Sequence, residues 1–331
     1  MRDQWKLWLT GLCLAVLSLT LFALTRSPDL RTQGLKELTS GDSVLGESLL
    51  ETHLQQHPDD KLIRRQLADN YARHGPPEKA VEHLQFLSHD PECEEESLRL
   101  LAALAIKSAD AALAEKSLIR ILELHPADFA ANLALGELYF NAGRAAEAIP
   151  VIEACIKADS ERPASYLLLA DALGEAGRNQ EMIKPLEECL RLSPEEFAAH
   201  ANLAFACYAA GRSDDAILHA EWCLDRQPDF HKVRLILAQA QRDKGEFEAS
   251  MANLQTVMNA EPDNLDAALL QADLLFFRGD GRLVYDRLIP FYDKHQKDRK
   301  LISHLMRAAV AKGDRQKAQK LQRVLSGLIP E

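Results

Sequence analysis

A period of 34 residues runs through most of this sequence. Positions are counted here in frames that begin at residues 27, 61, 95, 129, 163, 197, 231, 265 and 299. Position 15 is glycine in eight of the nine frames, and position 7 is leucine in seven of them. Position 8 is alanine or glycine in every frame except the last. Marks kept in register over so many copies indicate an array of equivalent structural units.

The stretch from Phe197 to Phe230 shows what one unit contains. It reads as two amphipathic helices that are joined at Gly211 and closed by Pro228. A residue between two antiparallel helices often needs the left-handed conformation, which glycine adopts without steric cost. Where Ala109 replaces this glycine, we expect the adjacent Asp110 to take that conformation. Small residues at positions 8 and 20 let helix backbones approach, and the leucines fill the space between repeats.

The pattern resembles the tetratricopeptide repeat, in which Leu-Gly, Tyr, Ala and Pro recur at these offsets. The best match runs from Asn132 to Ala148, where Leu135, Gly136 and Tyr139 fall on the family positions. The resemblance implies an all-α, right-handed superhelical solenoid of antiparallel helix pairs. We expect the array to occupy residues 42–331, as about eight repeats preceded by half a repeat.

An apolar segment precedes the array. Leu7 to Leu24 is eighteen residues without a charge, and at ~1.5 Å per residue it covers about 27 Å, close to the hydrocarbon thickness of a bilayer. We therefore expect residues 1–26 to form a single N-terminal transmembrane helix acting as a signal anchor, as in membrane-anchored bacterial members of the family. A cleavable signal is the alternative, although Ala23 gives it only a poor cleavage site.

Basic residues at the N-terminus predict the orientation of this segment. Arg2 and Lys6 precede the apolar run, so the N-terminus is expected in the cytoplasm and the repeats in the periplasm. Arg26 and Arg31, beyond the run, weaken this asymmetry. Residues 27–41 are polar and poorly periodic, and we expect them to be a tether.

The remaining chemistry of the sequence argues against several functions. The net charge is −11, and an acidic protein is a poor partner for nucleic acid. No phosphate-binding loop, metal-ligand motif or nucleophile signature is present, so we expect no cofactor, no metal and no enzyme. His53 and His57 are four residues apart, but they are expected to be surface residues. Cys155, Cys189 and Cys223 share one repeat position and are expected to be core residues rather than disulfide partners.

The family resemblance also suggests where a partner binds. In tetratricopeptide repeats the concave wall is usually lined by positions 2, 5, 6, 9, 12 and 13 of the first helices. Here these positions give thirteen candidate binding residues: Leu133, Glu137, Phe140, Leu167, Asp171, Asn202, Phe205, Tyr208, Gln239, Arg242, Asp273, Phe276 and Phe277. This wall is apolar and acidic, which suits an amphipathic or extended peptide with some positive charge. The alternative is that several of its leucines only thicken the repeat interfaces.

The frame at 265 departs most from the pattern. Gln271 replaces the core leucine, Val284 replaces the small residue, and Pro290 lies inside the expected second helix. A proline there is expected to kink the helix. We expect these departures to reflect decay of the repeat near its end. The alternative is that the kink opens the groove beside Phe276 and Phe277.

Together these features predict a membrane-tethered scaffold that holds a protein or peptide in the groove of the array. The alternatives are an accessory subunit that recruits substrate to a separate enzyme and a chaperone-like holder of exported proteins. The oligomeric state and the identity of the partner stay open.

Overall fold

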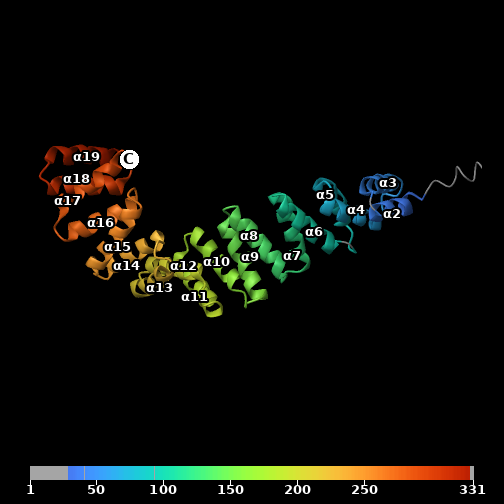
Figure 1. Cartoon of the computed structure of the whole chain (residues 1–331), viewed down its shortest axis with the longest axis horizontal. Coiled ribbons are helices and arrows are strands. Elements are labelled where there is room, and N and C mark those ends of the chain that lie inside the picture. Colours follow the sequence, from blue (N-terminus) through green and yellow to red (C-terminus); the bar gives the residue numbers. More distant parts are fainter. Residues whose placement is uncertain (1–28, 41, 93, 329–331) are drawn as a thin grey trace, which may run out of the picture. The chain divides into compact units, whose positions relative to one another are not determined.

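The computed structural model describes residues 29–40, 42–92 and 94–328, and all the regular elements within those ranges are helical (Figure 1). The first helices of successive pairs are α2 (Leu30–Ser40), α4 (Lys61–His74), α6 (Glu94–Lys107), α8 (Phe129–Asn141), α10 (Pro163–Glu175), α12 (Phe197–Ala209), α14 (His231–Asp243), α16 (Leu265–Phe277) and α18 (Arg299–Ala311). The second helices are α3 (Ser43–Gln56), α5 (Pro77–Leu87), α7 (Ala111–Leu124), α9 (Ala145–Ala158), η1 with α11 (Asn179–Met182, Ile183–Leu192), α13 (Ser213–Arg226), α15 (Phe247–Ala260), α17 (Gly281–Tyr292) and α19 (Arg315–Gly327).

The helices form two compact units, one up to Leu135 and one from Gly136 onward. Within each unit the fold is an all-α helical repeat solenoid, as predicted. Helices that follow one another pack together, as α4 and α5 do in unit 1 and α12 and α13 do in unit 2, and the first helices of successive repeats also touch in unit 2, as α12 and α14 do. From α10 to α18 the first helices therefore present a continuous face.

The core is built from the residues that recur at fixed positions of the repeat. In one cluster Ala204 and Leu237, from neighbouring first helices, pack with Ala220 and Cys223 of α13. Cys155, Cys189 and Cys223 are buried and unbridged, which confirms the expectation of core residues, and Cys207 is a fourth buried cysteine that the repeat position does not mark. Because burial raises the pKa of Cys223 to about 11, this thiol is protonated at neutral pH and is no nucleophile.

The turns explain the glycine ladder and correct one expectation. Gly211 and five other glycines at this position, from Gly143 to Gly313, have positive φ angles, 74° at Gly211. At the exception, Ala109 itself takes the left-handed conformation with φ 58°, so the prediction for Asp110 was wrong. Asp110 has φ −83° because it caps α7, where its carboxylate accepts from the Leu113 amide. Gly75 is extended (φ −114°), as expected for a residue that precedes proline.

Replacing Ala109 with glycine is expected to stabilise unit 1. Alanine in the left-handed region costs about 1–2 kcal/mol, and glycine removes this cost. Glycine also raises the conformational entropy of the unfolded chain, which offsets part of the gain, so a net stabilisation of about 0.5–1 kcal/mol is expected. Thermal or urea unfolding measures this gain. The control is Ala103→Gly at an exposed position inside α6, which should lose about 1 kcal/mol. A loss of stability in Ala109→Gly would contradict the claim that the backbone of Ala109 is strained.

The expected tether contains a helix. Leu30–Ser40 form α2, which packs against α3 and so completes the first pair of the array. The only residue that α2 buries is Gly34. Because no large apolar side chain of α2 is buried, its sequence shows no helical pattern of such residues. The helices approach through glycines: a Cβ added to Gly46 would lie 2.5 Å from the backbone nitrogen of Leu38.

The predicted transmembrane segment, residues 1–26, lies outside the described residues. Among the helices that the structure describes, none is long and apolar enough to cross a membrane.

Two repeats depart from the common pattern. In the frame at 163, Met182 occupies the small position and Gly174 of α10 leaves room for its side chain, since an added Cβ would lie 3.3 Å from the methionine. In the frame at 265, Gln271 is 1% exposed and its Oε1 accepts from Arg287, while its Nε2 is buried without a partner in the described part of the chain. Helix α17 continues through Pro290 to Tyr292, only two residues further.

Candidate functional site

The candidate residues all lie on first helices. Leu133 belongs to unit 1, and the other twelve belong to unit 2, on α8, α10, α12, α14 and α16. Because first helices of successive repeats touch within unit 2, we call the residues on α10, α12, α14, α16 and α18 of this side the first-helix face. Most candidates are half-buried; Glu137, Phe205 and Phe277 are exposed.

One polar pair on this face joins two repeats. The Asn202 amide of α12 donates to Asp171 Oδ1 of α10 at 2.7 Å. Burial raises the pKa of Asp171, and the nearby Glu175 adds to the rise, while the bond from Asn202 opposes it. The carboxyl group is therefore partly desolvated and already engaged, which makes it a weaker attraction for a basic ligand than an exposed carboxylate.

A second polar cluster lies further along the same face. His304 of α18 contacts Asp273 Oδ1 through Nε2 at 2.8 Å, and Arg242 of α14 lies 3.8 Å from Oδ2. The bond to His304 holds the pKa of Asp273 below its usual range, so this carboxylate is ionised but paired. His304 Nδ1 also faces an acceptor, the Lys300 carbonyl at 2.8 Å, so both bonds form together only when the ring carries two protons.

Exposed aromatic rings lie between and beside these polar groups. Phe205 of α12 is 40% exposed, and Phe277 at the end of α16 is 69% exposed. The Phe277 ring lies 4.3 Å from that of Phe247, which makes an aromatic pair at the edge of the face. Phe276 is half-buried under the Arg307 guanidinium, 4.0 Å from its ring centroid. Large apolar side chains left exposed beside fixed polar groups are typical of a binding surface.

The sequence reasoning overlooked two residues of this face, His304 and Arg307. They occupy positions 6 and 9 of the frame at 299, and the same offsets would have found them had they been applied to that last frame. Their contacts change the electrostatics of the face, because Asp273 is hydrogen-bonded to His304 and Arg307 adds a positive charge. Within the candidate set in unit 2, Glu137 of α8 is the acid that stays exposed and makes no ion pair with a described residue. The face is therefore less acidic than predicted.

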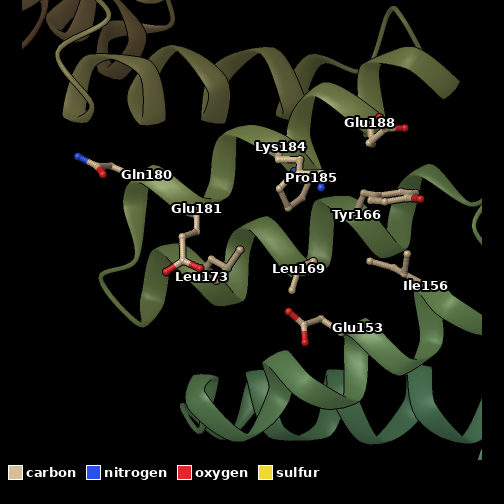
Figure 2. Close-up of a pocket in the computed structure, with 10 residues that line it drawn as sticks. All are labelled: Glu153, Ile156, Tyr166, Leu169, Leu173, Gln180, Glu181, Lys184, Pro185 and Glu188. Carbon is tan, nitrogen blue, oxygen red and sulfur yellow. The ribbon is translucent and has the colours of Figure 1, made fainter.

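A separate hollow lies on the second-helix side of unit 2. Figure 2 shows it between α9 and η1–α11, with α10 in the middle. It measures about 410 Å³, its floor is apolar, and Glu153, Glu181 and Glu188 lie along its rim. Glu181 and Glu188 are paired with Arg178 and Arg191 on their own segment, which cancels most of the rim charge. None of the thirteen candidates lines this hollow.

The described residues contain no group of three or more His, Cys, Asp and Glu side chains that could hold a metal ion. His53 was expected at the surface but is 9% exposed, because it turns inward and bonds Asp60 Oδ2 through Nε2 at 3.0 Å. His57 is exposed, as expected. The acidic run around Glu94 begins α6, and Arg120 pairs with Glu94.

Two histidines of unit 2, the buried His200 and the half-buried His219, form a pair. His200 Nε2 donates to the Pro194 carbonyl at 3.0 Å, so His200 Nδ1 accepts from His219 Nδ1 at 2.9 Å. The His200 ring also stacks on Trp222, with 3.7 Å between the ring centroids. Burial lowers the pKa of both histidines; Arg226 lowers that of His200 further, and the neighbouring His200 and Arg212 do so for His219. Glu195 and Asp215 oppose these shifts.

We expect unit 2 to lose stability as the pH falls below about 6.5. The unfolded histidines titrate near 6.5 and the folded ones lower, so the unfolded state binds more protons in acid and stability declines as pH falls. Melting temperatures measured between pH 7.5 and 5.5 test this expectation. His219→Gln should flatten the slope, whereas His74→Gln, at an exposed position, should leave it unchanged. Equal slopes in all three proteins would contradict the assignment.

Comparisons with known proteins agree with the fold. A profile of the tetratricopeptide repeat matches residues 99–163, 167–229 and 208–257. A tetratricopeptide repeat protein from Parabacteroides merdae shares 15% identity at a TM-score of 0.55, over 71% of this chain and 99% of that chain. The C-terminal part of a repeat protein from Cytophaga hutchinsonii shares 16% identity at a TM-score of 0.54, over 70% of this chain and 95% of that chain. PilW, a type IV pilus biogenesis factor, shares 17% identity at a TM-score of 0.52, over 60% of this chain and 92% of that chain. No curated protein matched the sequence.

The chain therefore contains tetratricopeptide repeats, and the helical repeat fold is shared with these solved structures. Proteins of this class bind protein or peptide partners, and they are typically scaffolds without a catalytic activity of their own. The fold thus indicates a protein–protein interaction scaffold.

Proposed function

We propose that this protein is a membrane-tethered scaffold that binds a protein or peptide on the first-helix face of unit 2. The observation that carries the proposal is the exposure of Phe205 and Phe277 beside the polar groups of that face. Rings of this kind, partly exposed on rigid helices, lose little entropy when a partner covers them. The mechanism is burial of apolar side chains in a preformed surface, with the tether raising local concentration at the membrane.

The contacts on the face refine the chemistry of the partner. Since Asp171 and Asp273 are already bonded, positive charge on the partner contributes less than the sequence suggested. The partner is an extended or amphipathic segment whose apolar side chains contact Phe205 and Phe277.

The tether and the location are part of the same proposal. The uncharged run from Leu7 to Leu24 anchors the protein in a bacterial inner membrane, with the N-terminus in the cytoplasm and the repeats in the periplasm. Added protease should cut the repeats in spheroplasts without lysis. Protection of the repeats until the membrane is broken would reverse the orientation.

Two related functions share these features, namely an accessory subunit for a separate enzyme and a chaperone-like holder of exported proteins. Pull-down from detergent extracts, with the full chain and with a chain lacking the segment up to Leu24, separates them. Stable partners without enzymatic activity support the scaffold. A catalytic subunit that co-purifies supports the accessory role, and many weakly held exported proteins support the holder.

A further inference from the structure

The charge of this protein is divided along the chain. Residues 294–328 contain ten Lys and Arg against two Asp, a net charge of +8. Residues 29–293 contain 26 Lys and Arg against 46 Asp and Glu, a net charge of −20. The basic segment corresponds to the last repeat, α18 and α19 with the loop before them. The net charge of −11 for the whole chain conceals this division.

The cations of the last repeat are available to a ligand. All ten are exposed. Three form ion pairs with Asp263, Asp286 and Asp314, and the Arg307 guanidinium lies over Phe276. The remaining six make no ion pair with any described residue: Lys297, Arg299, Lys300, Arg315, Lys320 and Arg323.

Local structure does not account for this concentration of charge. Asp298 and Asp314, the only acids of the segment, are the N-caps of α18 and α19, so both are used to begin helices. Cations near a helix C-terminus would be favoured by the helix dipole, but the last turns of α18 and α19 contain no basic residue. Helix α19 buries only Ala318 and Leu321, and it contains no acidic residue at all.

We propose that this basic last repeat, α18 and α19 with the loop before them, binds an anionic membrane surface. The six unpaired cations are spread over a loop and two helices rather than gathered in a pocket, which suits a diffuse layer of lipid headgroups better than one shaped ligand. The same membrane repels the acidic repeats, so contact is confined to the last repeat. A long nucleic acid would extend along the acidic repeats as well, and this disfavours it.

The inference rests on the proposed function only for the location of the protein at a membrane, because the binding of the last repeat to lipid needs no transmembrane tether. The test places the full chain in phosphatidylcholine nanodiscs and floats it with added vesicles. We expect it to float with vesicles of phosphatidylcholine and phosphatidylglycerol in a 7:3 ratio at 100 mM salt. It should not float with pure phosphatidylcholine vesicles, and 500 mM salt should release it. Empty nanodiscs control for exchange of lipid.

A matched pair of variants assigns the binding to the last repeat. Lys320→Glu with Arg323→Glu should lower the bound fraction at least about tenfold. Lys107→Glu with Lys116→Glu makes the same charge change at exposed positions of unit 1 and should have no effect. Equal flotation with neutral vesicles, or equal loss in both variants, would overturn the proposal. So would displacement of the vesicles by a 30-nucleotide single-stranded DNA that binds more tightly.

Failure of the tether is distinguishable in the same experiment. If the full chain does not enter nanodiscs, the tether of the proposed function is wrong, and the flotation assay is then run on the free protein with the same vesicles and variants.

Discussion

Replacing Tyr71 with alanine is expected to lower the free energy of unfolding of unit 1 by about 3–5 kcal/mol. Tyr71 is completely buried in α4, where its ring packs in one cluster with Leu50, Ile63 and Leu84. Its hydroxyl donates to Glu51 Oε1 at 3.0 Å, and its ring stacks on His83 at 5.9 Å between centroids. Truncation leaves both a cavity and polar groups without their partner.

The conservative variant separates these two effects. Tyr71→Phe keeps the ring and removes the bond to Glu51 together with a longer one, 3.4 Å, that Lys79 Nζ donates to the hydroxyl, so it should cost about 1 kcal/mol. In a repeat array the loss can be local, so hydrogen exchange of the α4 and α5 amides is measured together with the unfolding transition. A cost below 1 kcal/mol for Tyr71→Ala would show that α4 does not pack as described.

Gly46→Ala is expected to destabilise the first helix pair by about 1–3 kcal/mol. The added Cβ would lie 2.5 Å from the Leu38 nitrogen and 2.9 Å from its Cα, which are backbone atoms, so α2 must move as a whole. The sign of the change in stability is informative, because alanine is favoured over glycine by about 1 kcal/mol in a helix that has room for the added methyl group.

Gly327→Ala is the matched control for that experiment. Gly327 is also helical, as the last residue of α19, but a Cβ added to it would meet no heavy atom within 4 Å. It should be neutral or slightly stabilising. If Gly46→Ala also stabilised the protein, α2 would not be packed on α3, and residues 30–40 would behave as the tether that the sequence suggested.

The repeat architecture could be predicted because its determinants are local and periodic. Gly211 and its equivalents mark turns by their backbone freedom, and leucines such as Leu203 mark the core. The exceptions arise where two structural requirements meet at one position. At Ala109 the neighbour Asp110 was needed as a helix cap, and at Gly75 the following proline imposed an extended backbone. Helix α2 escaped prediction because it buries glycine rather than large apolar side chains.

The candidate site was predicted less completely, because its properties depend on contacts between repeats. The family offsets selected Asp171, Asn202 and Asp273 one by one, but they did not show that Asn202 bonds Asp171 or that His304 bonds Asp273. Such pairs join residues 31 apart, so they follow from how first helices stack and not from any short motif. The charge of the face therefore became clear only from the structure.

Capture of a partner by the first-helix face tests the central claim most directly. The full chain, extracted in detergent, is compared with Phe205→Ala combined with Phe277→Ala, and with Leu218→Ala combined with Leu283→Ala. The leucines, 63% and 51% exposed, lie on the second helices α13 and α17, so the control removes similar apolar surface from the other side. We expect the phenylalanine variant to retain at most about a tenth of the partner and the leucine variant to retain all of it. Equal capture by both variants would contradict the account.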